Sequence, residues 1–162
     1  MAIRNILQDN DPMLRKKSRE VTVFDARLHQ LLDDMAQTMA SVDGAGLAAV
    51  QGGVLRRAAL VDAGDGLVEL VNPEIIHFSE EIQSGAEGCL SLPGWIGTVE
   101  RPLQVTVRAQ DRHGNLIEVT GEELKSRALC HEIDHLDGVL FQDRASDLYE
   151  LPPDDEYADE EL

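Results

Sequence analysis

The sequence predicts an α+β fold, in which mostly antiparallel sheets pack around a central helix that carries two histidines. Three patterns support this prediction: an amphipathic helix over about residues 26–42, short strands between residues 58 and 120, and a last helix over about residues 121–137. Strands that occur in runs, with one helix before them and one after them, indicate separate α and β elements rather than a wound parallel sheet.

The N-terminal part contains two helix-start signals. Asp11 precedes Pro12, which favours a short helix or turn at this point. Asp25 can cap the helix that follows it, and the apolar residues of that helix recur at the spacing of one buried face. These residues are Leu28, Leu31, Leu32, Met35, Met39 and Val42.

The segment over residues 44–53 is rich in glycine and alanine, so its backbone can approach another group closely. After it, residues 58–62 and 67–71 are typical of two short strands joined by a Gly-Asp-Gly turn. We expect Asn72-Pro73 to end the second strand, because proline cannot donate to a sheet, and residues 74–83 to form another.

The middle of the chain is expected to alternate turns and strands. Residues 85–91 are predicted to form a glycine-bearing turn and residues 92–97 a loop. Alternating apolar and polar residues over 103–110 predict a half-buried strand. Residues 111–115 then form a hairpin loop that leads to a return strand over residues 116–120.

The last helix is predicted from its two ends. Thr120 and Glu123 have the spacing of a capping box, and Gly138 suits a left-handed C-terminal cap. At about 100° per residue, one narrow face of this helix carries two histidines with small and apolar neighbours. The residues of this face are Leu124, Ala128, His131 and His135, and Cys130 and Asp134 fall on the other side.

His131 and His135 flank Glu132 in a His-Glu-x-x-His pattern. Residues four apart lie on the same face of a helix, so the two imidazoles can bind one ion. Glu132 lies too far round the helix to join them but can reach a water molecule held there. The pattern therefore predicts a metal site with an activated water, on the helix at the centre of the fold.

A catalytic metal usually has three protein ligands, so a further ligand is needed. Cys89, Cys130 and a carboxylate all remain candidates from the sequence. Cys130 neighbours His131 and faces away from it, whereas Cys89 lies in a glycine-flanked segment that is free to approach. Spacing alone favours Cys89 only slightly.

Composition restricts the class of protein. The 162 residues are 43% hydrophobic and 28% charged, which fits one globular domain over residues 1–146. Eight acids and no base follow between Asp147 and Leu162, so residues 147–162 are expected to be an acidic, flexible tail. The net charge of −17 argues against direct nucleic-acid binding. Two cysteines, no signal-peptide pattern and no long apolar run predict a cytoplasmic protein without a membrane segment.

Three blocks in this order resemble the signatures of the peptide deformylases: residues 44–51 (GAGLAAVQ), residues 87–91 (EGCLS) and residues 131–135 (HEIDH). The resemblance extends from Asp11 to about Phe141. It implies a peptide deformylase-like fold, with residues 1–146 as the catalytic domain. It also implies an enzyme that hydrolyses the N-formyl group from the initiator methionine of nascent polypeptides and releases formate.

The resemblance also implies roles for individual residues. Cys89, His131 and His135 would hold the metal, typically Fe²⁺ in this family, although Zn²⁺, Ni²⁺ or Co²⁺ can occupy the site in a purified sample. Glu132 would act as the base, and the Gln51 amide and the Leu90 backbone N–H would stabilise the oxyanion. The substrate, an N-formylmethionyl peptide or nascent chain, would contact Gly44, Ala45, Gly46, Gly88, Leu124 and Ala128.

Three positions are of further interest. Gly52 stands where the family usually has valine, so the loop that carries Gln51 could be looser. Ala45 stands where a larger aliphatic residue is common, which implies a roomier pocket. The resemblance also suggests that Arg101 pairs with Asp134 and holds the metal-binding helix in place.

Two other functions fit part of the pattern. An endopeptidase of the His-Glu-x-x-His kind would require a third ligand downstream, but no histidine follows His135 and Glu150 lies in the acidic tail. A non-catalytic relative that only binds formylated chains would be expected to lack Glu132 or Gln51, and both are present.

Overall fold

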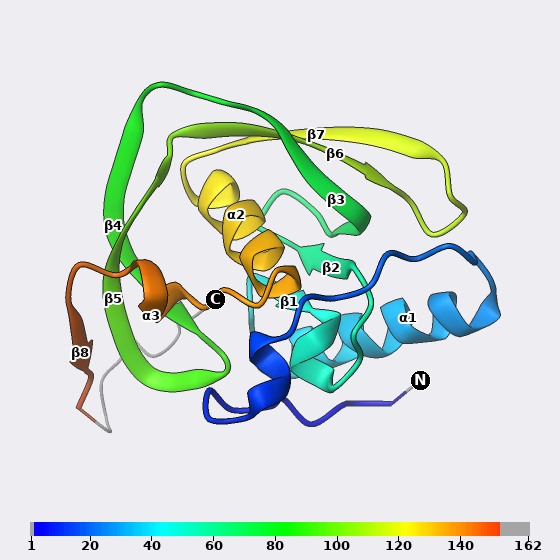
Figure 1. Cartoon of the computed structure of the whole chain (residues 1–162), viewed down its shortest axis with the longest axis horizontal. Coiled ribbons are helices and arrows are strands. Elements are labelled where there is room, and N and C mark those ends of the chain that lie inside the picture. Colours follow the sequence, from blue (N-terminus) through cyan, green and yellow to red (C-terminus); the bar gives the residue numbers. More distant parts are fainter. Residues whose placement is uncertain (1, 153–162) are drawn as a thin grey trace.

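The computed structural model describes residues 2–152, which form two antiparallel sheets and three α-helices. The five-stranded sheet has the order β1-β2-β3-β6-β7, and the three-stranded sheet has the order β4-β5-β8. Figure 1 shows α2 between the two sheets, with α1 at the opposite end of the molecule from β8. The elements are η1 (Pro12–Arg15), α1 (Ala26–Ser41), β1 (Gly46–Ala48), η2 (Ala49–Gly52), β2 (Ala58–Val61), β3 (Val68–Phe78), β4 (Ile82–Cys89), β5 (Leu92–Pro102), β6 (Gln104–Gln110), β7 (Leu116–Glu122), α2 (Leu124–Leu136), α3 (Phe141–Arg144) and β8 (Leu148–Glu150).

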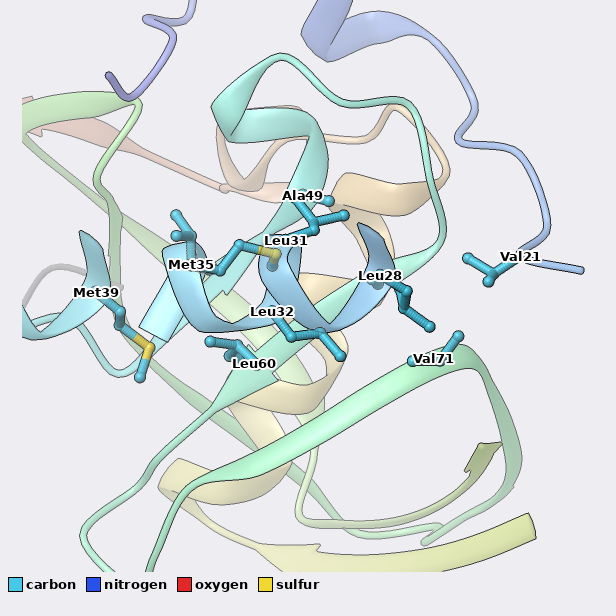
Figure 2. Close-up of a cluster of buried hydrophobic side chains, with 11 residues drawn as sticks. Val21, Leu28, Leu31, Leu32, Met35, Met39, Ala49, Leu60 and Val71 are labelled. Carbon is cyan, nitrogen blue, oxygen red and sulfur yellow. The ribbon is translucent and has the colours of Figure 1, made fainter. Parts of the chain in front are cut away.

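The predicted N-terminal helix is confirmed, except that it ends at Ser41, and Val42, which was expected on its buried face, is 43% exposed. The Asp25 side chain accepts a hydrogen bond from the Leu28 N–H at 3.2 Å and so caps α1. The apolar face of α1 packs on β2 and β3 (Figure 2). This cluster contains Val21, Leu28, Leu31, Leu32, Met35, Met39, Leu47, Ala49, Ala58, Leu60 and Val71.

The expected strand break at Asn72-Pro73 is wrong, because β3 continues through it to Phe78. The pairing of β3 with β6 shifts register after Val71, and Asn72 has a φ of 51°. A bulge of this kind accommodates a proline, because the missing N–H leaves no ladder partner unpaired. The Asn72 side chain also bonds to the N–H and the carbonyl of Val21 at 2.8 Å each.

The predicted turn over residues 85–91 and the loop over residues 92–97 are also wrong. Residues 82–89 and 92–102 are the paired strands β4 and β5, and only Leu90 and Ser91 form the turn. The glycines of these strands make room for neighbours. A Cβ on Gly97 would stand 2.7 Å from the Cβ of Ala145, just after α3.

The end of the last helix is confirmed and its start is corrected. Gly138, with a φ of 77°, follows the helix C-cap as predicted. The capping box is wrong: Thr120 belongs to β7, and α2 begins at Leu124 without a side-chain cap. Ten of the 13 residues of α2 are buried, among them Cys130, so both sides of this helix face protein.

The chain returns to the small sheet after α3. Leu148–Glu150, at the start of the segment expected to be a flexible tail, forms β8 and pairs with Trp95–Gly97 of β5. The other part of that prediction, residues 153–162, lies outside the described residues. Within residues 2–152, no helix has both the length and the apolar composition needed to span a membrane.

Candidate active site

Three side chains meet at the centre of the molecule. Cys89 ends β4, while His131 and His135 lie one turn apart on α2. The Sγ of Cys89 lies 3.2 Å from Nε2 of His135, and that nitrogen lies 3.2 Å from Nε2 of His131. All three side chains are at most 2% exposed. The structure therefore brings together the predicted sulfur and the two predicted imidazoles.

The geometry of this cluster fits a divalent metal ion. Tetrahedral bonds of about 2.3 Å to sulfur and about 2.0–2.1 Å to nitrogen place the ligand atoms roughly 3.3–3.6 Å apart. The three ligand atoms lie within 4.8 Å of one another. Three such ligands leave a fourth position for water or substrate. Among residues 2–152, this is the group of histidine, cysteine and acidic side chains that could hold an ion.

Glu87 fixes the orientation of one imidazole and was missed in the sequence. Its Oε2 lies 2.7 Å from Nδ1 of His131, which leaves Nε2 of that ring free to face the ion. Glu87 lies two residues before Cys89 on β4, and although the pairing with β5 shifts register between them, both side chains face α2. That spacing would have identified Glu87, had the segment been predicted as a strand.

Two arginines hold Glu87. Arg101 donates to both of its carboxylate oxygens, at 3.1 and 2.6 Å, and Arg127 donates to Oε1 at 2.9 Å. Burial favours the protonated form of Glu87, but its contacts with His131 and Arg101 outweigh burial and lower its pKa well below the usual value. Glu87 is therefore an anion that can support a neutral, metal-binding His131.

The predicted contact of Arg101 with Asp134 is confirmed at 2.6 Å. Asp134 also accepts two hydrogen bonds from Arg144 of α3, at 2.6 and 2.9 Å. Burial opposes the charge of Arg101, yet Glu87 and Asp134 together raise its pKa. The metal-binding helix is thus tied to β4 through Arg101 and to α3 through Arg144.

Protonation at the two histidines reflects their neighbours. Burial opposes a charge on His131, but Cys89 and then Glu87 outweigh it and raise the pKa of His131. Burial and the charge of His131 both lower the pKa of His135. A divalent ion competes with these protons, because imidazole binds a metal only in its neutral form.

Glu132 is fully buried beside the cluster. Neither of its carboxylate oxygens has a hydrogen-bond partner among the described residues. Burial, opposed by the charge of His131, raises the pKa of Glu132 from 4.5 to about 7. A carboxyl group whose pKa lies near neutrality can both accept and donate a proton there.

Gln51 lies in η2, next to Cys89. Its Nε2 is 3.7 Å from Sγ of Cys89 and donates to Oγ of Ser91 at 3.1 Å. Its Oε1 accepts from the Ala48 N–H at 2.9 Å, which fixes the orientation of the amide. Leu90 follows Cys89 directly, so the predicted oxyanion donors both adjoin the cysteine.

The residues predicted to contact substrate lie in three segments. Gly44 and Ala45 are half-buried before β1, Gly46 begins β1, and Gly88 is buried in β4. Ala128 is fully buried in α2, whereas Leu124 is 51% exposed at its start. Two hollows of about 650 and 620 Å³ lie elsewhere, and neither is lined by any of the metal-site residues.

Phe141 of α3 packs against His131 and Cys89. Its ring stacks on His131 with centroids 6.3 Å apart and an interplanar angle of 24°. It also belongs to a buried cluster with Cys89 and Val99. One aromatic side chain therefore packs against both the strand and the helix that supply the ligands.

Comparison with known proteins identifies the family. The family model for polypeptide deformylase matches residues 3–150. A peptide deformylase of Alkaliphilus metalliredigens is 56% identical over 144 residues, which cover 89% of this chain and 97% of the relative. The crystal structure of peptide deformylase from Thermotoga maritima matches with a TM-score of 0.88 and 39% identity, over 91% of this chain and 100% of that chain.

A second solved structure is a class I type b peptide deformylase from Acinetobacter baumannii with bound Met-Ala-Ser. It matches with a TM-score of 0.85 and 32% identity, over 88% of this chain and 98% of that one. The fold, the cysteine and histidine cluster and both sequence comparisons agree. The chain belongs to the polypeptide deformylase family, the metal-dependent hydrolases that remove the N-formyl group from nascent polypeptides.

Proposed function

We propose that Cys89, His131 and His135 hold Fe²⁺ and that Glu132 is the catalytic base. One thiolate and two imidazoles also suit Zn²⁺, Ni²⁺ and Co²⁺, which can replace iron in a purified sample. When bound, such an ion supplies Lewis acidity and lowers the pKa of a water molecule from 15.7 toward about 7. The ligand geometry and the contact of Glu87 with His131 support this assignment.

Glu132 accepts the proton of the attacking water and later delivers it to the departing amine. The observation that carries this proposal is the buried carboxylate without a partner, one residue from a ligand. An acid that shuttles one proton in each turnover needs a pKa near the working pH. A pKa of about 7 places Glu132 in that range.

Gln51 and Leu90 stabilise the negative charge that develops on the formyl oxygen. The Gln51 amide is held by Ala48 and Ser91, so it is oriented before substrate arrives. Losing one such donor typically costs about 2.7–4 kcal/mol of barrier. The Leu90 N–H, in the turn after Cys89, is the second donor.

The substrate is an N-formylmethionyl peptide at the end of a nascent chain in the cytoplasm. Its backbone pairs in an extended form with residues 44–46, and Gly88 allows close approach from β4. The methionine side chain lies near Leu124 and Ala128. Met-Ala-Ser, bound in the Acinetobacter baumannii relative, corresponds to the deformylated product of such a peptide.

Formate release from formyl-Met-Ala-Ser tests the proposal, with wild-type protein and Glu132→Ala prepared without oxygen. We expect kcat to fall by roughly 10²–10⁴ in the variant, the usual contribution of a general base. A blocked internal peptide serves as the control for endopeptidase activity and should not be cleaved. Equal formate release by the two proteins would exclude Glu132 as the base. Anaerobic handling protects both the ferrous ion and Cys89 from oxidation.

A further inference from the structure

Gly46, the first residue of β1, lies directly against the side chain of Glu132. A Cβ on Gly46 would stand 2.3 Å from Oε2 of Glu132, 2.9 Å from its Cδ and 3.0 Å from its Cγ. Carbon atoms in favourable contact lie about 3.5–4.0 Å apart, and a Cβ atom essentially never lies closer than 3.0 Å to another non-bonded heavy atom. The missing side chain of Gly46 therefore leaves the volume that the carboxylate of Glu132 occupies.

Glu132 has little room to move away from an added methyl group. Three successive atoms of its side chain would meet that group, so rotation of the carboxylate alone does not relieve the contact. The residue is 0% exposed. The backbone opposite is held by the pairing of Gly46 with Val61 and by the hydrogen bond from Asp62 N to Ala45 O at 2.8 Å.

No hydrogen bond among the described residues fixes the Glu132 carboxylate, since both of its oxygens lack a partner. Its position is therefore set by its place on α2 and by the surface against which it packs. The backbone of β1 at Gly46 is part of that surface. A side chain there would shift the carboxylate relative to the neighbouring imidazoles.

We propose that Gly46 is a positioning residue for Glu132: its missing side chain provides the space that fixes the base relative to the reacting atoms. The inference rests on the proposed role of Glu132. It differs from the role that family resemblance implies for this glycine, which is close approach of the substrate backbone. Loss of positioning lowers kcat, whereas loss of substrate approach raises KM.

A thermal double-mutant cycle tests the contact without any need for activity. Gly46→Ala is measured in the wild-type and Glu132→Ala backgrounds, all four proteins being chelator-treated. We expect Gly46→Ala to lower Tm by roughly 3–10 °C in the wild-type background, as an overfilled core does in a domain of this size. In the Glu132→Ala background the vacated space accepts the methyl group, so the same change should shift Tm by less than about 2 °C.

Gly44→Ala is the matched control, because it adds a methyl group in the same segment against a different residue. Its Cβ would stand 3.0 Å from Cδ1 of Leu90. Its effect on Tm should be the same with and without Glu132→Ala. If Gly46→Ala lowers Tm equally in both backgrounds, the inference is wrong. If Gly46→Ala alone does not fold, recovery of folded protein in the double variant supports the inference, and no recovery overturns it.

Formate release then separates positioning from substrate approach. We expect Gly46→Ala to lower kcat by roughly 10- to 100-fold, because displacing a catalytic group by about 1 Å costs that much. KM should change by less than about three-fold. A raised KM with kcat retained, or unchanged kinetics, would overturn the inference. If the wild-type protein releases no formate, the proposed function fails, while the thermal cycle still decides whether Gly46 positions Glu132.

Discussion

Replacing Glu132 by glutamine should change how the stability of the metal-free protein depends on pH. The Glu132 carboxyl group is fully buried and has no hydrogen-bond partner among the described residues. Burial, opposed by the charge of His131, raises its pKa from 4.5 to about 7. The folded protein therefore keeps a proton on Glu132 over a pH range in which the unfolded chain releases it.

The size of the effect follows from the two pKa values. Each unit between them corresponds to about 1.36 kcal/mol, so the interval from 4.5 to about 7 corresponds to about 3 kcal/mol. Because the folded-state pKa is the higher one, the wild-type protein has this stability in full below pH 4.5 and loses it as the pH rises through about 7. Above that pH the native state carries a buried charge without a partner. In a domain of this size, the loss corresponds to roughly 6–12 °C in Tm.

Thermal unfolding of chelator-treated wild-type protein and Glu132→Gln should be compared in steps from pH 4.5 to about pH 8. The glutamine side chain of Glu132→Gln does not titrate. Its burial cost is the same at every pH, so it does not affect how the difference in Tm changes with pH. The Tm of the variant should gain on the wild type by roughly 6–12 °C across this range. Glu118→Gln, at an exposed position of β7, is the control for removal of one surface carboxylate. A difference in Tm that stays constant over the whole range would refute this reasoning.

Three further predictions concern metal binding, the ion pairs of Arg101 and the packing of Gly52. Cys89→Ala removes the proposed sulfur ligand, so elemental analysis after dialysis should find little bound metal; full retention would exclude Cys89 as a ligand. Arg101→Leu removes two hydrogen bonds to the buried Glu87 and one to Asp134, so it should lower the free energy of unfolding in urea by about 3–5 kcal/mol; an unchanged free energy of unfolding would contradict this prediction. Gly52→Val places a Cβ 3.3 Å from Cδ of Arg4. Arg4→Ala should relieve the resulting loss of stability by about 0.5–3 kcal/mol, and additive effects of the two changes would argue against this contact.

The elements with regular periodicity could be predicted from the sequence. The apolar residues of α1 recur with helical spacing, those of β6 alternate, and β7 was expected as the return strand after a hairpin loop; all three elements are confirmed. The segment over residues 85–97 could not be predicted in the same way. Its glycines and proline are typical of turns, yet in β4 and β5 the glycines make room for Arg127 and Ala145. Close packing with distant residues determined the structure there, and local preference did not.

The errors in the site follow from the errors in the fold. His131 and His135 were found because both lie on one helix, where a spacing of four residues brings side chains together. Cys89 comes from another element, so spacing favoured it only slightly over Cys130, and the family resemblance decided. Glu87 was missed because residues 85–91 were predicted as a turn, in which residues two apart have no common side. The same mistake thus concealed both the strand and the side chain that orients His131.

Side chains from one helix and one strand, α2 and β4, surround His131. The helix spacing of about 3.6 residues per turn places His135 below it and turns Glu132 toward β1. Cys89 and Glu87, two residues apart on β4 with a register shift between them, both face α2, where Cys89 contacts His135 and Glu87 contacts His131. A one-residue slip of β4 would remove both side chains from the site together. The five hydrogen bonds that Arg101 and Arg144 make to Glu87 and Asp134 oppose such a slip, because they tie β5, the neighbour of β4, and α3 to the strand and helix that meet at the site. We therefore expect the hydrogen bonds of Arg101 and Arg144 to support metal binding by holding β4 against α2, in addition to keeping Glu87 charged beside His131.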